Sequence, residues 1–311
     1  MNKFFSILAF AIVFLVAISC ESCNGGGEGT ETDTIANNSE FDEQKFFEGI
    51  DQSKVAQINA IVEGFTSPVE MAAMIKNNHI EFSKDYLVET SIADSYETNI
   101  KKAIGLGVLS ADLGYLNIYQ KTGQMVDYLV AINNIAGDLR VAQFFDFQTL
   151  KTLVTNGDNM DSLLFMTVSS FHQIDAYFTS SNRSFLTVLS VTGVWIESLY
   201  LLTQVAKDNE FKDFTTQIGT QKDLLTQLVE IVKVYKGHPQ FDYILENLKN
   251  VQKAFDPVTI TVQETEGRVE FIDGNYIIYP SEETVIDVPE GTLENIIKAT
   301  ETARNSIINI K

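Results

Sequence analysis

The stretch that decides the fold is Lys102-Ala-Ile-Gly-Leu-Gly-Val-Leu-Ser-Ala-Asp-Leu-Gly-Tyr-Leu-Asn-Ile-Tyr-Gln-Lys121, in which Asp112 is the only charged side chain between the two end lysines. A second stretch, residues 183–207, has the same character and carries only Glu197 between its ends. Both are long enough for helices and are apolar nearly all round, a pattern typical of helices buried at the centre of a bundle. We therefore predict a helical bundle with these two helices in its core.

Helical periodicity extends on both sides of these stretches, and the chain has only five prolines. The first expected helix opens with Ser67-Pro68-Val69-Glu70, where the serine caps the helix and the proline takes its first position. Turn signals at Thr122-Gly123, 156–159 and 180–183 separate later helices. The expected helices cover about residues 67–77, 94–120, 124–140, 159–177, 183–207, 217–236, 239–255 and 293–309. Their short connections favour an antiparallel arrangement.

The last fifty residues change to a strand-like pattern before the final helix. Residues 258–262 alternate at strand period, and residues 269–279 hold Asp273-Gly274 between two β-prone runs. The predicted fold class is therefore mainly α, an antiparallel multi-helix bundle with a small C-terminal β-hairpin and a final helix. Residues 257–291 form a β-containing appendage of a single helical domain over 42–311.

The N-terminus has the pattern of a lipoprotein signal peptide. Lys3 precedes an apolar run of residues 4–18, and the run closes with Ala17-Ile18-Ser19-Cys20. We predict that residues 1–19 are cleaved and that Cys20 then carries the acyl chains that hold the protein on a membrane. The alternative is an ordinary cleaved signal with an incidental cysteine.

Residues 20–41 are rich in Gly, Thr, Asn, Ser and acids, and such a composition does not bury enough apolar surface to order itself. We therefore expect this lipidated segment to be a flexible tether with a root-mean-square reach of roughly 25 Å. An outer-membrane location follows as an expectation, on the periplasmic side or at the cell surface. The only other cysteine is Cys23, so no disulfide is expected within the domain.

The formal net charge of −20 excludes nucleic acid as an expected partner, because phosphate contacts require clustered Lys and Arg. No nucleophile elbow, phosphate-binding loop, dinucleotide motif or calcium loop is present in the sequence. The histidines His79, His172 and His238 lie far apart along the chain. We expect neither a metal site nor a cofactor, no catalytic residue is assigned, and an enzymatic role is left open as the less favoured one.

The two mid-helix acids define a candidate polar site. A carboxylate in such a helix must find a donor, a cation, solvent or a proton. Tyr115 and Tyr200 each follow an acid by three residues and share its helical face. The favoured interpretation is structural, with hydroxyls, Arg183 or Arg140 satisfying the acids. The alternatives are a ligand pocket between the helices and a pair of acids for acid/base catalysis. The candidate residues are Asp112, Tyr115, Glu197, Tyr200 and Arg183.

Small residues in the first central helix, Gly105, Gly107 and Gly114 among them, would let another backbone approach closely. The stretches 107–115 and 193–200, with the turn at Thr122-Gly123, resemble a family of uncharacterised helical lipoproteins from Bacteroidota. The resemblance spans about residues 67–256. It implies a helical fold and a lipoprotein location, and because the family has no assigned activity it implies no mechanism.

Two classes of function follow from these patterns. The favoured one is a membrane-anchored, non-enzymatic binding or accessory subunit at the outer membrane, with a protein partner in an envelope complex. The alternative is a small-ligand binder or hydrolase that uses the polar site between the central helices. It predicts an open cleft that both carboxylates face.

Overall fold

The computed structural model describes residues 42–51, 53, 74–75, 77–156, 160–208, 212–272, 275–279 and 281–310. The predictions for the signal peptide, Cys20, the tether, the helix start at 67–70 and the turn Asp273-Gly274 lie outside the described residues. The described residues all belong to the compact unit that begins at Asp42.

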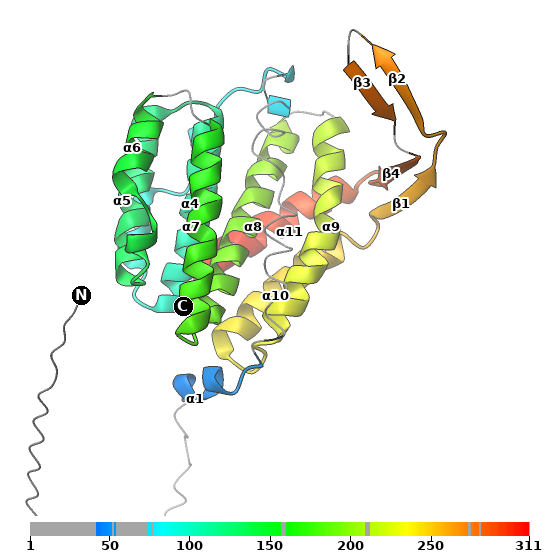
Figure 1. The fold of residues 1–311 in the computed structure, drawn as a ribbon. Helices are drawn as coiled ribbons and strands as arrows, with labels where there is room; N and C mark the ends of the chain where they lie inside the picture. The colour runs from blue at the N-terminus through cyan, green and yellow to red at the C-terminus, as the bar shows by residue number, and fades with distance from the viewer. Residues whose placement is uncertain are drawn as a thin grey trace, which may run out of the picture. The chain divides into compact units, whose positions relative to one another are not determined.

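The described part is mainly helical, with a small antiparallel β element and a final helix, so the predicted fold class is confirmed (Figure 1). Three short 3-10 helices lie at Lys84–Tyr86 (η2), Thr90–Ser95 (η3) and Ala142–Phe144 (η4). The α-helices are α1 (Glu43–Glu48), α4 (Asn99–Ile118), α5 (Thr122–Asp138), α6 (Phe147–Asn156), α7 (Met160–Ser180), α8 (Ser184–Asp208), α9 (Lys212–Lys233), α10 (Pro239–Ala254) and α11 (Thr292–Ile308).

The two apolar stretches form α4 and α8, and their mutual contact is the most extensive between any two described elements. They meet at glycines. A Cβ added at Gly107 would overlap the backbone oxygen of Ser190, and one at Gly193 would overlap the backbone oxygen of Ile104. The expected close approach is confirmed there. It is wrong for Gly114, which has no heavy atom within 4 Å of a would-be Cβ.

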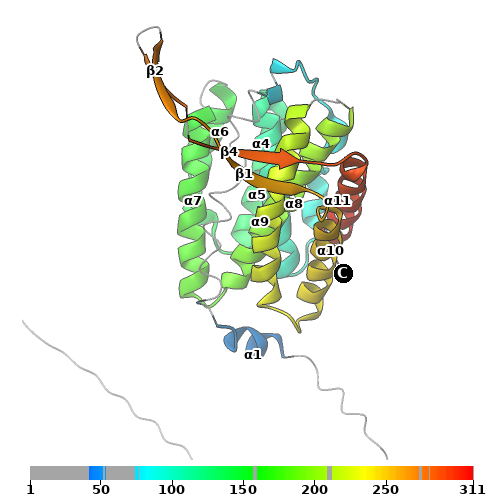
Figure 2. The same ribbon diagram turned by 90° about the vertical axis from the view of Figure 1, so that its right-hand side faces the viewer.

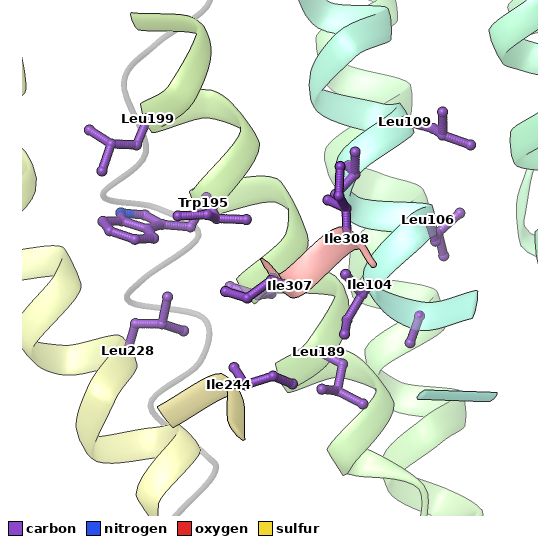
Figure 3. Close-up of a cluster of buried hydrophobic side chains, with 14 of the residues drawn as sticks. Ile104, Leu106, Leu109, Leu189, Trp195, Leu199, Leu228, Ile244, Ile307 and Ile308 are labelled. Carbon is purple, nitrogen blue, oxygen red and sulfur yellow. The ribbon is translucent and has the colours of Figure 1, made fainter. Parts of the chain in front are cut away.

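Helix α11 packs against α8, α10 and α4 and covers part of the core. Figure 3 shows Ile307 and Ile308 of α11 among Ile104 of α4, Leu189 of α8 and Ile244 of α10. All five side chains are buried. α8 is the one described helix long and apolar enough to cross a membrane by length and composition alone, and most of it is buried inside the protein.

The helices differ from the sequence prediction at several boundaries, and one helix is new. α4 begins at Asn99 rather than near 94, because the Thr98 side chain accepts a hydrogen bond from the backbone N–H of Lys101 and caps the helix. The chain turns at Gln120, whose φ is 53°, and Thr122 already opens α5. α6 was not predicted, and it lies between the first and second turn signals, after the expected end of the preceding helix near residue 140.

The β region holds one more strand than predicted. β2 (Arg268–Ile272) and β3 (Asn275–Tyr279) pair antiparallel at the predicted hairpin, whereas β1 (Thr259–Glu264) pairs antiparallel with the unpredicted β4 (Glu282–Asp287). Figure 2 shows β1 and β4 crossing α9. At that crossing Ile286 of β4 packs close to Gly219 of α9, where a side chain would collide with it. The appendage is therefore seated on the bundle through α9.

Helix α1 is held on the bundle by aromatic contacts. The ring of Phe47 stacks on Phe185, at the start of α8, with 3.8 Å between ring centroids and an interplanar angle of 5°. Phe47 also stacks on His238, the residue that caps α10. Glu43 of α1 lies 3.3 Å from the Nε2 atom of His238. These contacts tie the start of the domain to the ends of two of its helices.

Candidate functional site

Glu197 of α8 is fully buried, and an arginine from the last helix satisfies it. Arg304 donates from Nε to Oε2 of Glu197 at 2.8 Å and from Nη2 to Oε1 at 2.7 Å. This bidentate arrangement is the strongest geometry that a guanidinium and a carboxylate form. The Arg304 guanidinium also lies over the ring of Tyr200, with Cζ 4.3 Å from the ring centroid. Tyr200 therefore contacts the acid's partner through its ring.

Asp112 of α4 is also fully buried and has a different partner. Its Oδ2 atom accepts a hydrogen bond of 3.0 Å from the backbone N–H of Val88, in the segment that runs beside α4 and α5. The hydroxyl of Tyr128, on α5, donates to the carbonyl of the same residue. Both backbone polar groups of Val88 are thus held by buried side chains, and the segment is fixed against the two helices.

The second oxygen of Asp112, Oδ1, has no hydrogen bond of regular geometry among the described residues. The charge from another helix that acts most strongly on the Asp112 carboxyl is the carboxylate of Glu197, and the two groups influence each other's pKa. The two acids predicted from the central helices therefore converge.

Burial and the adjacent Glu197 carboxylate raise the pKa of Asp112 well above its ordinary value, and the Val88 amide only partly opposes them. Burial also raises the pKa of Glu197, against the two hydrogen bonds from Arg304. Burial alone would lower the pKa of Arg304, but Glu197 reverses this and the pKa is raised. The consistent charge state at neutral pH is a neutral Asp112 beside an ionised Glu197–Arg304 pair.

Tyr96 completes the surroundings of the three groups. Burial, then the Glu197 charge, raises its pKa, so its hydroxyl stays neutral. Its ring fills the space above Gly105, where a Cβ would overlap it. The Tyr96 hydroxyl is buried and has no regular hydrogen-bond partner among the described residues.

Two of the sequence-predicted site residues lie elsewhere. The Tyr115 hydroxyl accepts a hydrogen bond of 3.2 Å from the backbone N–H of Ser83. Arg183 donates from Nη1 and Nη2 to the carbonyl of Leu139, at 3.3 and 3.2 Å, and stacks on Phe178. The expectation that Arg183 or Arg140 satisfies the acids was wrong, because Arg304 and the Val88 amide do so.

Arg304 was the residue that sequence reasoning missed. It shares a face of the final helix with Ile297, Thr300 and Ile307, all of them buried. A charged residue at an apolar position of an amphipathic helix signals a buried partner, and this signal was present in the sequence. This signal predicts that Arg304 has a buried acidic partner, but it does not identify the acid.

Both acids are sealed from solvent, so the open cleft that the enzymatic alternative predicts is not seen at them. A shallow groove of about 300 Å³ lies instead on the outer side of α10 and α11 and is lined by Asn247, Asn250, Asn295, Lys298, Ala299, Thr302 and Ala303. Within the described ranges, no group of three or more His, Cys, Asp and Glu side chains is arranged to hold a metal ion.

Comparison of the chain with family models, with curated proteins and with solved structures found no match. The geometry defines a helical-bundle domain whose buried charges tie together α4, α8, α11 and the segment at Val88.

Proposed function

We propose that this chain is a lipid-anchored, non-enzymatic binding or accessory subunit at the outer membrane. The observation that carries the proposal is the sequence Ala17-Ile18-Ser19-Cys20, followed by a polar, glycine-rich tether. Acyl chains on Cys20 would each contribute about 0.8 kcal/mol per buried methylene, enough to hold the domain at a membrane without a spanning helix.

The buried acids support the non-enzymatic part of the proposal. A general acid or base must reach the substrate within hydrogen-bond distance. Asp112 and Glu197 are 0% exposed, and they accept hydrogen bonds from the Val88 amide and from Arg304, respectively. Their arrangement joins four segments into one domain, which suits a protein that presents surfaces to a partner.

The anchor is tested by labelling cells that express the full chain with a palmitate analogue and comparing the Cys20→Ser and Cys23→Ser variants. We expect label in the native chain and in Cys23→Ser, and none in Cys20→Ser, which should keep its signal peptide or leave the membrane fraction. Equal labelling of both variants would contradict the assignment. Protease treatment of intact cells then distinguishes the cell surface from the periplasmic side.

The partner is tested by crosslinking in cells, followed by purification in detergent. A binding subunit should yield one defined membrane partner at constant stoichiometry, and the Cys20→Ser variant should lose it along with the membrane. Repeated recovery of the monomer alone would contradict the accessory role.

The alternative of a small-ligand binder or hydrolase rests on one observation, the convergence of Asp112 and Glu197. It requires the segment at Val88 to open, because this segment covers Asp112. The measurement is amide hydrogen exchange with and without a candidate ligand. If the ligand protects other amides but protects the Val88 amide less, because this segment has opened, the alternative is favoured over the proposal.

A further inference from the structure

The ribbon of β1 and β4 leaves the outer edge of each strand without a neighbouring strand among the described residues. β1 pairs only with β4, and the ribbon meets the bundle on one face, at α9. A two-stranded ribbon is marginally stable alone, and an open strand edge is a template for pairing with another chain. The edge of β1 therefore offers main-chain groups to a partner.

The register shows which backbone groups of β1 point outward. The backbone N–H of Thr265 donates to the carbonyl of Ser281 at 2.8 Å, which makes these two residues a hydrogen-bonded pair just beyond the ladder. Hydrogen-bonded and non-bonded pairs alternate along an antiparallel ladder. Val262 and Glu264 consequently direct their N–H and C=O groups away from β4. No backbone group outside the ribbon, within the described ranges, bonds to them.

The side chains along this edge are open to solvent. Residues 261–264 are exposed, and Val262, at 64%, is the most exposed of the large hydrophobic side chains that the structure describes. On β4 the paired residues Thr284 and Glu282 are exposed but polar, and the apolar side chains Val285 and Ile286 are half-buried. Both outer edges have outward main-chain groups, but only β1 adds an exposed apolar side chain, Val262, and strand addition uses this combination.

The charge of the ribbon indicates the kind of partner. Residues 259–290 contain eight acidic residues and one basic residue, Arg268. The exposed side chains of Glu264, Glu282 and Glu283 form no ion pair with any described residue. Like charges oppose pairing with a second copy of this ribbon, whereas a lysine- or arginine-rich strand would complement it.

We propose that the outer edge of β1 binds an extended, basic segment of a partner protein by strand addition. Main-chain hydrogen bonds at Val262 and Glu264 would supply the register, the Val262 side chain an apolar contact, and the glutamates selectivity for cations. This deepens the proposed function, since it names the surface through which the accessory subunit binds.

The test uses the purified full chain and two synthetic peptides, one of alternating valine and lysine and one of alternating valine and glutamate. Fluorescence anisotropy of labelled peptide should show binding of the lysine peptide, weakened by salt, and at least about tenfold weaker binding of the glutamate peptide. Amide hydrogen exchange should slow at Val262 and Glu264 on binding. The amides of Thr261 and Gln263, which face β4, should change little.

Two proline variants separate the edges. Val262→Pro removes an outward N–H of β1 without breaking the ladder and should weaken binding of the lysine peptide by about tenfold or more. Thr284→Pro does the same on the opposite edge, because Thr284 pairs with Val262, and should leave binding within about twofold. The charge variant Glu264→Lys, which leaves the backbone intact, should weaken binding several-fold.

Circular dichroism of each variant checks that the bundle is folded. If a proline variant unfolds, the binding of Glu264→Lys and the hydrogen-exchange pattern of the native chain test the proposal instead. Equal binding of both peptides, equal loss in the two proline variants, protection of the β4 edge instead, or self-association of the chain without added peptide would each overturn the proposal. None of these results depends on the lipid at Cys20, so failure here is distinguishable from failure of the anchor.

Discussion

The guanidinium of Arg304 and the carboxylate of Glu197 form a buried bidentate pair, with 2.7 Å between Nη2 and Oε1, across 107 residues of sequence. Glu197 is 0% exposed and Arg304 is 8% exposed. The pair joins the final helix to the central helix α8, so the C-terminal end of the chain is part of the core.

Replacing Arg304 with methionine should destabilise the domain by about 3–5 kcal/mol, because it leaves the Glu197 charge buried without a partner. Urea denaturation of the full chain measures this loss. Lys233→Met, which breaks an exposed pair with Glu230, is the matched control and should cost less than about 1 kcal/mol. The double variant Glu197→Leu with Arg304→Met should lose less than the sum of the two single losses. Strict additivity would show that the two side chains act independently.

Much of this core could be predicted from the sequence. The apolar runs with single acids predicted the two central helices, and the glycines predicted their close approach at Gly107. Arg304 and Val88 could not be assigned as partners, because helical periodicity gives a buried face without saying which distant element covers it. A backbone N–H such as that of Val88 has no residue-type signature at all. β4 was missed because Glu282-Glu283 is atypical of strands, and pairing with β1 overrides this weak preference.

Asp112→Asn should make stability less dependent on pH. The pKa of Asp112 is raised in the folded protein, so the folded state holds a proton that the unfolded state releases above about pH 4. The native chain therefore loses stability as pH rises from that point towards the folded pKa, by up to about 1.4 kcal/mol per pH unit. Asparagine is neutral at every pH, and it keeps an acceptor for the Val88 amide and a donor towards Glu197.

Denaturation at several pH values from 4 to 8 should show the variant gaining on the native chain as pH rises. Asp94→Asn, at an exposed position, is the control and should follow the native curve. A constant difference between the Asp112 variant and the native chain would mean that Asp112 is ionised in the folded protein.

Phe47→Ala should release α1 while leaving the bundle folded. A six-residue helix is not stable alone, so its order depends on stacking against Phe185 and His238. We expect faster amide exchange in Glu43–Glu48 and new protease cleavage near α1, with helical content elsewhere retained. Gln44→Ala, on the exposed side of α1, should change neither. Unaltered exchange in the Phe47 variant would show that other contacts hold α1 in place.

The central crossing can be tested at single glycines. Gly107→Ala places a methyl group against the backbone of α8, with Val194 N only 2.7 Å away, and Gly193→Ala does the same against α4. Backbone cannot rotate aside as a side chain can, so the helices must separate, at a typical cost of about 1–3 kcal/mol for overpacking.

Gly114→Ala lies on the same helix as Gly107 but meets nothing within 4 Å. It should stabilise the domain by roughly 0.5–1 kcal/mol, because alanine is the better helix former. Melting temperatures that fall for the first two variants and rise for the third would separate packing from helix propensity, and a rise for all three would mean that α4 and α8 do not pack at these glycines.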